Sequence, residues 1–302
     1  MTFTIAHLSD AHLSPAPFPH WKEMRLKRFM GYINWRRERV RVNDMGALAR
    51  LVADMLGHKP DHIAMTGDVV NIALAIEFKR AVEWMKSFGD PNDVSFTPGN
   101  HDAYVRDAME GLARSFQPWT RGDGVAPGAE KFPYLRARKN IAIIGLNSGV
   151  PTAPLLASGK LGEAQLAQLP LLLDSAREKG LARVVLIHHP PHATAGRPLL
   201  RGLNDAREFE RIVEAHGAEA ILHGHTHKRL LNFLPSHATR HASGRVPVFG
   251  APSCSSTSRD PRQRAAYFLI RFERAGDVWR THARARGLLG SGEIGEHEPL
   301  AL

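Results

Sequence analysis

The sequence has a single cysteine, Cys254, and no long apolar segment. One cysteine cannot form a disulfide within the chain, and its place in a Ser-rich stretch indicates a small buried residue rather than a nucleophile. No run reaches the roughly 18 consecutive apolar residues that a membrane-spanning helix needs. Residues 2–8 are strand-like and lead directly into polar residues, so they do not form a secretory signal peptide. These absences predict a cytoplasmic protein without disulfides or membrane spans.

Repeats and low-complexity segments are also absent, and acidic residues are outnumbered by basic ones. The chain has 302 residues, of which 43% are hydrophobic, and this is enough to bury one large core. Lys and Arg total 40 against 30 for Asp and Glu, which gives a formal charge of +10. This balance favours an anionic partner such as a phosphorylated substrate, a nucleic acid or an acidic membrane surface, and the charge alone does not distinguish them.

Short apolar runs alternate with helical patterns along most of the chain. Strands are expected at 3–8, 62–66, 94–97, 141–146, 184–187 and 220–222, with helices at about 75–88 and 161–179 between them. Alternating strands and helices predict an α/β fold, in which functional sites gather at the carboxyl ends of the strands.

The C-terminal part of the chain lacks long helices. Apolar stretches at 228–234, 246–249, 266–272 and 278–283 are expected to be consecutive antiparallel strands that close a second sheet. From residue 287 onward there is no periodicity, which predicts a loose tail over 287–302. We therefore expect one domain over residues 1–286, with an insert at about 14–42.

Polar blocks rich in histidine, aspartate and glycine follow five of the apolar runs. The blocks are Asp10-Ala11-His12, Gly67-Asp68, Gly99-Asn100-His101-Asp102, His188-His189 and Gly224-His225-Thr226-His227. They supply seven ligand-type side chains, namely Asp10, His12, Asp68, Asn100, His188, His225 and His227. This set exceeds the needs of one tetrahedral ion and predicts two adjacent metal ions that share a carboxylate. Oxygen and imidazole ligands without thiolate favour manganese, iron, cobalt or zinc.

The ordered set of blocks resembles the calcineurin-like metallophosphoesterases, and the resemblance covers Thr2 to about Phe272. It implies a four-layer α/β/β/α sandwich with two metal ions at the sheet mouths and a metal-bridging hydroxide as nucleophile. It also implies one metal held by Asp10, His12 and His227 and another held by Asn100, His188 and His225, with Asp68 as the bridge. In this family the residue at His101 contacts the phosphate, as Asn100 does, and assists the leaving oxygen. We expect an anionic phosphoester substrate and no nucleic-acid partner.

Sequence differences from family subgroups narrow the expected activity. The protein phosphatases carry a second acid and an Arg after the Gly-Asp pair, whereas this chain reads Val69-Val70-Asn71. The His188-His189-Pro190-Pro191 block and the turn at 250–253 resemble the bacterial class III cyclic-nucleotide and glycerophosphodiester phosphodiesterases. The alternatives are a membrane-associated pyrophosphohydrolase of a lipid-linked nucleotide such as UDP-diacylglucosamine, and a non-catalytic scaffold with the same fold.

Other polar residues near the blocks have weaker assignments. Asp102 is a candidate for orienting the His101 ring. His189, His192 and His223 are expected to be solvated or to lie behind the ligands.

The insert carries an unusual mixture of cations and large apolar residues. Residues 21–41 contain eight Lys or Arg against two Glu, and Leu26, Phe29, Met30 and Ile33 follow helical spacing. This pattern predicts a basic amphipathic helix with an irregularity at Gly31. Three interpretations stay open: a lid over the metals, a contact in a homo-oligomer, or a helix on a membrane surface. The last would place a cytoplasmic protein at the membrane periphery.

Overall fold

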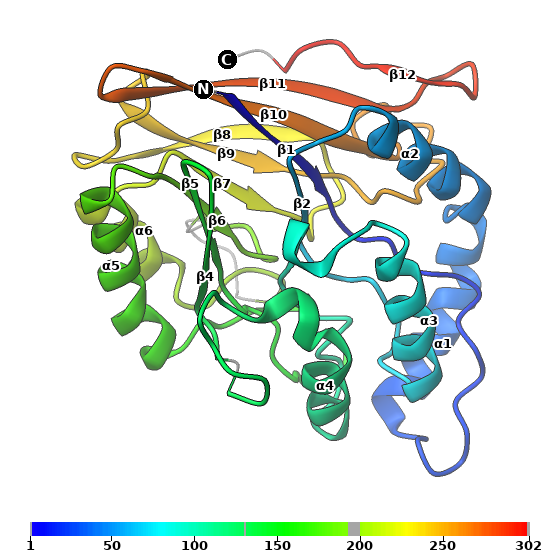
Figure 1. Cartoon of the computed structure of the whole chain (residues 1–302). Coiled ribbons are helices and arrows are strands. Elements are labelled where there is room, and N and C mark those ends of the chain that lie inside the picture. Colours follow the sequence, from blue (N-terminus) through cyan, green and yellow to red (C-terminus); the bar gives the residue numbers. More distant parts are fainter. Residues whose placement is uncertain (1, 130, 193–199, 301–302) are drawn as a thin grey trace.

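The computed structural model describes residues 2–129, 131–192 and 200–300, and its core is a pair of sheets packed between helices (Figure 1). One six-stranded sheet has the order β12-β11-β10-β1-β2-β3, and the other six-stranded sheet has the order β4-β5-β6-β7-β9-β8. The first sheet consists of β1 (Thr2–Leu8), β2 (His62–Met65), β3 (Val94–Phe96), β10 (Ala266–Ala275), β11 (Val278–Leu288) and β12 (Ile294–Glu296). The second sheet consists of β4 (Tyr134–Arg138), β5 (Ile141–Gly145), β6 (Ala182–Leu186), β7 (Ala220–His223), β8 (Leu230–Pro235) and β9 (Arg245–Gly250).

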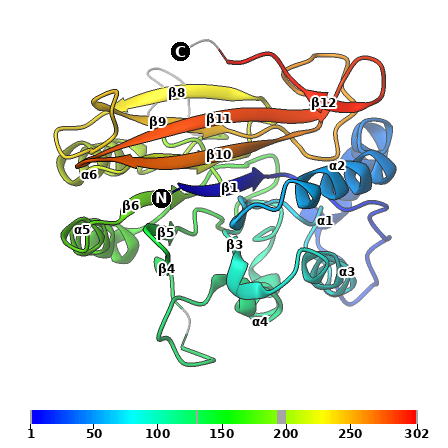
Figure 2. The same ribbon diagram turned by 45° about the horizontal axis from the view of Figure 1, so that its top comes forward.

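Helices cover the outer face of each sheet, which completes the predicted four-layer α/β/β/α sandwich (Figures 1 and 2). Three helices pack on the first sheet, α2 (Met45–Gly57), α3 (Ala75–Lys86) and α4 (Met109–Thr120). Two helices pack on the second sheet, α5 (Glu163–Glu178) and α6 (Ala206–His216). One apolar core lies between each helical layer and its sheet, and another lies between the two sheets.

Strand β1 illustrates why the central strands read as nearly continuous apolar runs. Phe3 and Ile5 belong to the core between the sheets, whereas Ala6 and Leu8 belong to the core shared with α2, α3 and α4. Because successive side chains of a strand point to opposite faces, a strand covered on both faces is apolar throughout. The polar residues that follow Leu8 therefore lie at the carboxyl edge of the sheet.

The four apolar stretches after residue 228 do form strands, but they do not form one sheet. β9 pairs antiparallel with β8 and parallel with β7, so both strands extend the second sheet. β10 pairs antiparallel with β11 and with β1, so these strands extend the first sheet. The connection between β9 and β10 passes the end of β1, where Ser253 Oγ donates to the Asp10 carbonyl at 2.7 Å. The apolar pattern identified each strand but carried no information about its pairing partner.

The prediction of a loose tail from residue 287 is wrong for the start of that segment. β11 continues to Leu288, and Arg286, Gly287 and Leu288 pair antiparallel with β12. The Leu288 side chain is buried with Ala47 of α2 and with Ala265. The segment therefore closes one edge of the first sheet, although it is too short to show a strand periodicity. Residues 301–302 of the predicted tail lie outside the described residues.

The insert contains helix α1 (Leu26–Arg37) and a short 3₁₀ turn, η1 (Arg39–Arg41). The helix continues through Gly31 without the expected irregularity. A Cβ at Gly31 would lie 2.2 Å from the hydroxyl oxygen of Tyr104, so the glycine lets the helix pack directly on that side chain. The glycine is thus explained by close packing rather than by a break in the helix.

The burial of α1 differs from that of an ordinary amphipathic helix. Lys27 and Arg28 are buried, whereas Leu26 is 70% exposed and Phe29 is 42% exposed. The cations reach inward to backbone carbonyls of neighbouring loops, which compensates their burial. Among the described residues, none of the helices combines the length and the apolar composition that crossing a membrane requires.

Candidate metal centre

The seven predicted ligands meet at the carboxyl ends of five strands drawn from both sheets. Asp10 and His12 follow β1, Asp68 follows β2, Asn100 follows β3, His188 follows β6, and His225 and His227 follow β7. Ligand atoms of Asp10, His12 and His227 lie within 4.8 Å of one another, and so do those of Asp10, Asp68 and His188. Parallel strands of both sheets point their carboxyl ends to one edge of the sandwich, which is why residues far apart in sequence come together.

The backbone at this edge is strained at most of the predicted ligands. Positive φ angles occur at Asp10 (54°), His12 (42°), Asp68 (53°), His225 (67°) and His227 (51°). Residues other than glycine adopt this left-handed region rarely, although Asp, Asn and His do so more than most. Such strain concentrates at functional sites, where the surrounding structure holds the side chains in a fixed arrangement.

The first group of ligands brings three electron-rich atoms together. Asp10 Oδ1 lies 3.1 Å from His227 Nε2 and 3.8 Å from His12 Nε2, and the two Nε2 atoms are 3.3 Å apart. Although Asp10 Oδ1 is buried, it accepts no hydrogen bond from the described residues. A buried carboxylate oxygen without a donor is costly unless a cation completes it.

The second group is built around the side-chain oxygen of Asn100. Asn100 Oδ1 lies 2.9 Å from His225 Nδ1 and 3.3 Å from His188 Nε2. Asp68 Oδ2 lies 3.3 Å from His188 Nε2 and 3.9 Å from His12 Nε2. One oxygen of Asp68 is therefore placed between a histidine of each group, which is the position that a bridging carboxylate requires.

The charges around His188 also fit cations at this site. Burial alone would lower the pKa of His188, but the carboxylates of Asp68 and Asp10 outweigh it and raise the pKa to about 9. The same carboxylates stabilise any positive charge placed between them. Together with the oxygen and nitrogen donors, this field fits two adjacent metal ions.

Two glycines allow the ligand loops to approach one another. A Cβ at Gly99 would lie 2.1 Å from Asp68 Oδ1, and a Cβ at Gly224 would lie 2.4 Å from Asp10 Oδ2. With glycine at these positions, Asp68 Oδ1 accepts from His101 N at 2.7 Å. The Gly-containing blocks of the sequence are thus explained by close contact between loops at the site.

Asp102 holds two of these loops together. Contrary to the prediction, it does not orient the His101 ring. Its carboxylate accepts hydrogen bonds from the backbone N–H groups of Gly99 at 2.8 Å, Asp68 at 2.7 Å, Val69 at 3.0 Å and Val70 at 3.2 Å. It therefore joins the loop after β2 to the loop after β3 and fixes the position from which Asp68 projects.

His101 lies beside the ligands and is oriented by a backbone carbonyl. Its Nδ1 is 2.5 Å from the carbonyl oxygen of Asn71, and its ring stacks on Tyr104 with centroids 5.4 Å apart. Because Nδ1 donates to that carbonyl, the lone pair of the neutral ring is on Nε2. Burial lowers the pKa of His101 to about 3, and the charge of Arg39 adds to this effect.

Arg39 is a functional residue that the sequence pattern did not single out. Its guanidinium NH2 lies 2.7 Å from His101 Nε2, and its NH1 lies 3.0 Å from His12 Nδ1. Burial lowers the pKa of Arg39, and the side chain remains charged because free arginine deprotonates only above pH 12. The only signal in the sequence was the density of cations in the insert, which did not distinguish Arg39 from Arg36, Arg37 or Arg41.

The other histidines near the blocks lie behind the ligands. The two ring nitrogens of His189 face Ser148 Oγ at 2.8 Å and the carbonyl of Ala157 at 3.2 Å. The His223 ring is buried and its Nδ1 faces the Gly224 carbonyl at 2.9 Å. Although the ring of His189 lies close enough to His188 and His225 to form a third ligand group, both of its nitrogens already have partners.

Comparison with known proteins agrees with this geometry. The family model of the calcineurin-like phosphoesterases matches residues 3–229. No curated protein matches significantly. A dimetal phosphatase from Danio rerio is similar in structure, with a TM-score of 0.58 and 15% identity over 93% of this chain and 98% of that chain. A purple acid phosphatase from yellow lupin has a TM-score of 0.55 and 11% identity over 98% of this chain and 53% of that chain. The NAD nucleotidase of Haemophilus influenzae has a TM-score of 0.51 and 14% identity over 99% of this chain and 54% of that chain.

The structural similarities, all at low identity, establish the fold, and the family match spans most of the chain. The matched residues include every predicted metal ligand from Asp10 to His227. The chain therefore belongs to the calcineurin-like phosphoesterase family, as a metal-dependent phosphoester hydrolase.

Proposed function

We propose that this protein hydrolyses a phosphodiester of the cyclic-nucleotide or glycerophosphodiester type, with two metal ions of the manganese, iron, cobalt or zinc class. The position of Asp68 between the two groups of ligands carries the proposal, because one shared carboxylate keeps two cations adjacent. One ion would be held by Asp10, His12 and His227 and the other by Asn100, His188 and His225.

The roles of the protein groups follow from their positions around Asp68. Two bound dications would lower the pKa of a coordinated water and neutralise charge on the phosphoryl oxygens. His101 and Asn100 would bind the substrate phosphate, because the His101 ring lies edge-on against His12 of one group and Asn100 lies in the other group. Held at Nδ1 by the Asn71 carbonyl, His101 would point Nε2 toward the departing oxygen, and it would protonate that oxygen only from the imidazolium form, with a proton on Nε2.

The loop after β2 supports a small phosphodiester over a phosphoprotein substrate. Asn71 occupies the position where the protein phosphatases carry a second acid. Its side chain donates to the carbonyl of Leu13 at 2.8 Å and so joins two loops of the chain. The block also lacks the arginine that follows the second acid in the protein phosphatases.

A second candidate function is the hydrolysis of a lipid-linked pyrophosphate such as that of UDP-diacylglucosamine. The observation in its favour is the exposure of Trp21 (72%), Leu26 (70%) and Phe29 (42%) on the insert that also carries Arg39. Large apolar side chains beside a basic surface are typical of membrane-surface segments. In this case the protein would contact the membrane peripherally through residues 21–41.

A substrate panel distinguishes these functions. Metal-depleted protein is assayed with and without added manganese on cyclic nucleotides, glycerophosphodiesters, UDP-diacylglucosamine and phosphomonoesters. The proposal predicts manganese-dependent turnover that is highest on a phosphodiester. Highest turnover on UDP-diacylglucosamine selects the second candidate. Lack of hydrolysis of any ester by metal-loaded protein contradicts both and leaves a non-catalytic scaffold, which the complete set of ligands disfavours.

A further inference from the structure

Arg39 is a half-buried cation with an unusual set of partners. In the part of the chain that the structure describes, its guanidinium contacts ring nitrogens of His12 and His101 and forms no ion pair with a carboxylate. Most buried arginines are paired with carboxylates or with several carbonyl oxygens. Arg28, only eleven positions earlier, follows that rule, with its guanidinium on the carbonyls of Ile72 and Ala73 at 3.1 and 2.7 Å.

The proton positions on the two histidines leave Arg39 with spare donors. His101 offers Nε2 as an acceptor, because its Nδ1 donates to Asn71. His12 differs, since its Nε2 faces Asp10 and Asp68 and its Nδ1 lies 3.2 Å from the Val70 carbonyl. A histidine that uses Nε2 as a ligand carries its proton on Nδ1 and donates it to such a carbonyl. In that tautomer NH1 of Arg39 faces an N–H group and has no acceptor.

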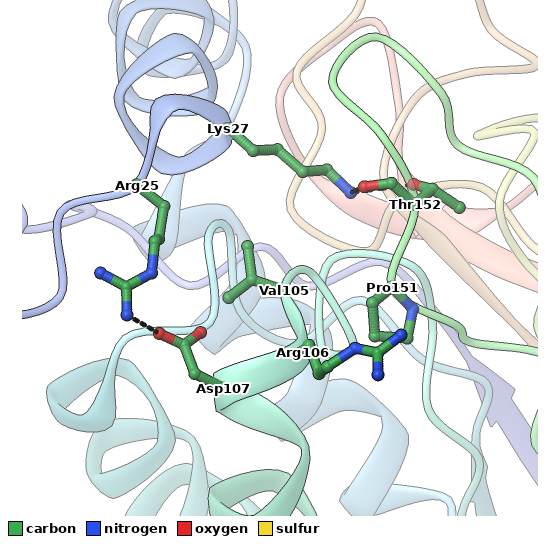
Figure 3. A pocket seen from close by; sticks show the side chains of 7 residues that line it. All are labelled: Arg25, Lys27, Val105, Arg106, Asp107, Pro151 and Thr152. Atoms are coloured by element: carbon green, nitrogen blue, oxygen red, sulfur yellow. Dashed lines mark hydrogen bonds and ion pairs between the residues drawn. The ribbon is translucent and has the colours of Figure 1, made fainter.

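The segments on both sides of Arg39 are fixed in place. Lys27 Nζ donates to the carbonyl of Thr152 at 2.9 Å, and Arg25 pairs with Asp107 at 3.1 Å (Figure 3). Lys27 also lies over the ring of Tyr104, the residue that stacks on His101. After the turn, the Val42 carbonyl accepts from Thr257 N at 2.7 Å, so Arg39 lies between two anchored segments and needs little ordering when it binds a ligand.

We propose that Arg39 binds the non-bridging oxygens of the substrate's scissile phosphoryl group, next to His101. Its planar guanidinium presents paired donors that match two phosphoryl oxygens. The insert then supplies a substrate-binding residue to a site whose metal ligands all follow strands of the sandwich. This inference rests on the proposed function, because it takes the ligand to be a phosphoester.

The test uses three variants of the full-length protein loaded with manganese. Arg39→Gln removes the charge, Arg39→Lys keeps the charge without the paired donors, and Arg41→Gln is the control from the same turn, with an exposed side chain. Three quantities are measured for each: metal content, the dissociation constant for inorganic phosphate by calorimetry, and KM and kcat for bis(p-nitrophenyl) phosphate.

Arg39→Gln is expected to weaken phosphate binding by at least about tenfold, because a hydrogen bond to a charged group is lost. Metal content stays at the wild-type value, KM rises, Arg39→Lys recovers part of the affinity, and Arg41→Gln behaves as wild type. Unchanged phosphate affinity in Arg39→Gln, or loss of metal from it, overturns the inference. A wild-type protein that hydrolyses no phosphoester contradicts the proposed function instead, while the phosphate titration still decides the role of Arg39.

Discussion

The carboxylate of Asp102 accepts the backbone N–H of Asp68 at 2.7 Å, and this contact joins the loops that follow two neighbouring strands. The same carboxylate holds Gly99, so it lies behind both the bridging position and Asn100. The geometry of the two ligand groups therefore depends on a residue whose oxygens bind backbone N–H groups of the loops rather than the ligand side chains.

Replacing Asp102 by Asn is expected to weaken metal binding. The amide has one acceptor oxygen in place of two and presents an NH2 group to backbone donors. Loss of such a supporting contact typically costs 10- to 100-fold in metal affinity. Titration of metal-depleted protein with manganese measures this affinity. Asp93→Asn, an exposed substitution immediately before β3, is the control, and equal affinity in the two variants would contradict this role.

Two metal ions per chain are expected at saturation. The Asn100 side chain contacts His188 and His225 of the second group. Asn100→Ala is therefore expected to lower the metal content toward one ion per chain, because the ion held by Asp10, His12 and His227 stays bound. Elemental analysis of dialysed protein measures the ratio. A wild-type ratio of one that Asn100→Ala does not change would rule out the two-metal arrangement.

His101→Ala is expected to retain both metals and to lose turnover. The His101 ring contacts the group of Asp10, His12 and His227 through an edge-on contact with His12. Its removal therefore leaves the hydrogen bonds that position the ligands. Turnover of a diester with a poor leaving group is expected to fall by about 10² to 10⁴, and by less with nitrophenolate, which needs little protonation. Metal analysis and the two rates are measured on the same preparation. Loss of metal would make His101 a structural part of the site.

The membrane interpretation of the insert predicts binding to vesicles of anionic lipid that weakens as salt screens the basic residues. Trp21→Ser with Leu26→Ser and Phe29→Ser is expected to release the protein while sparing hydrolysis of a small soluble diester. Ile33 is half-buried and is unsuitable for this test. Leu171→Ser on α5, where the side chain is 68% exposed, is the matched control. Absence of vesicle binding at low salt leaves the lid and subunit-contact interpretations.

Asp54 is expected to make the stability depend on acid pH. Hydrogen bonds from Arg286 at 2.8 and 2.9 Å lower the pKa of Asp54 in the folded protein. A carboxylate with a lowered folded-state pKa stabilises the protein above its unfolded pKa of about 3.9, and this contribution is lost as the pH falls through the folded-state pKa. The difference in Tm between wild type and Asp54→Asn is therefore expected to be largest near neutral pH and to shrink below about pH 4. A constant difference would contradict the assignment.

The ligands and the layers of the sandwich could be predicted from the sequence because both depend on local patterns. A strand buried on two faces must be apolar, and the polar block after it must lie at the sheet edge, so Asp10, Asp68 and His188 were recognisable one by one. Their assignment to two metals came from resemblance to a family, and the structure places ligand atoms of Asp10, His12 and His227 within 4.8 Å of one another.

Other features were decided by contacts between distant segments. The apolar pattern of β10 is the same whichever sheet it joins, and only its pairing with β1 assigns it to the first sheet. Leu26 and Lys27 each fit either face of a helix, and the carbonyl of Thr152 determines that the cation turns inward. Arg39 has the same local sequence signal as its basic neighbours. It differs from them because the 3₁₀ turn after α1 directs its guanidinium to His101, and a one-dimensional pattern does not encode that direction.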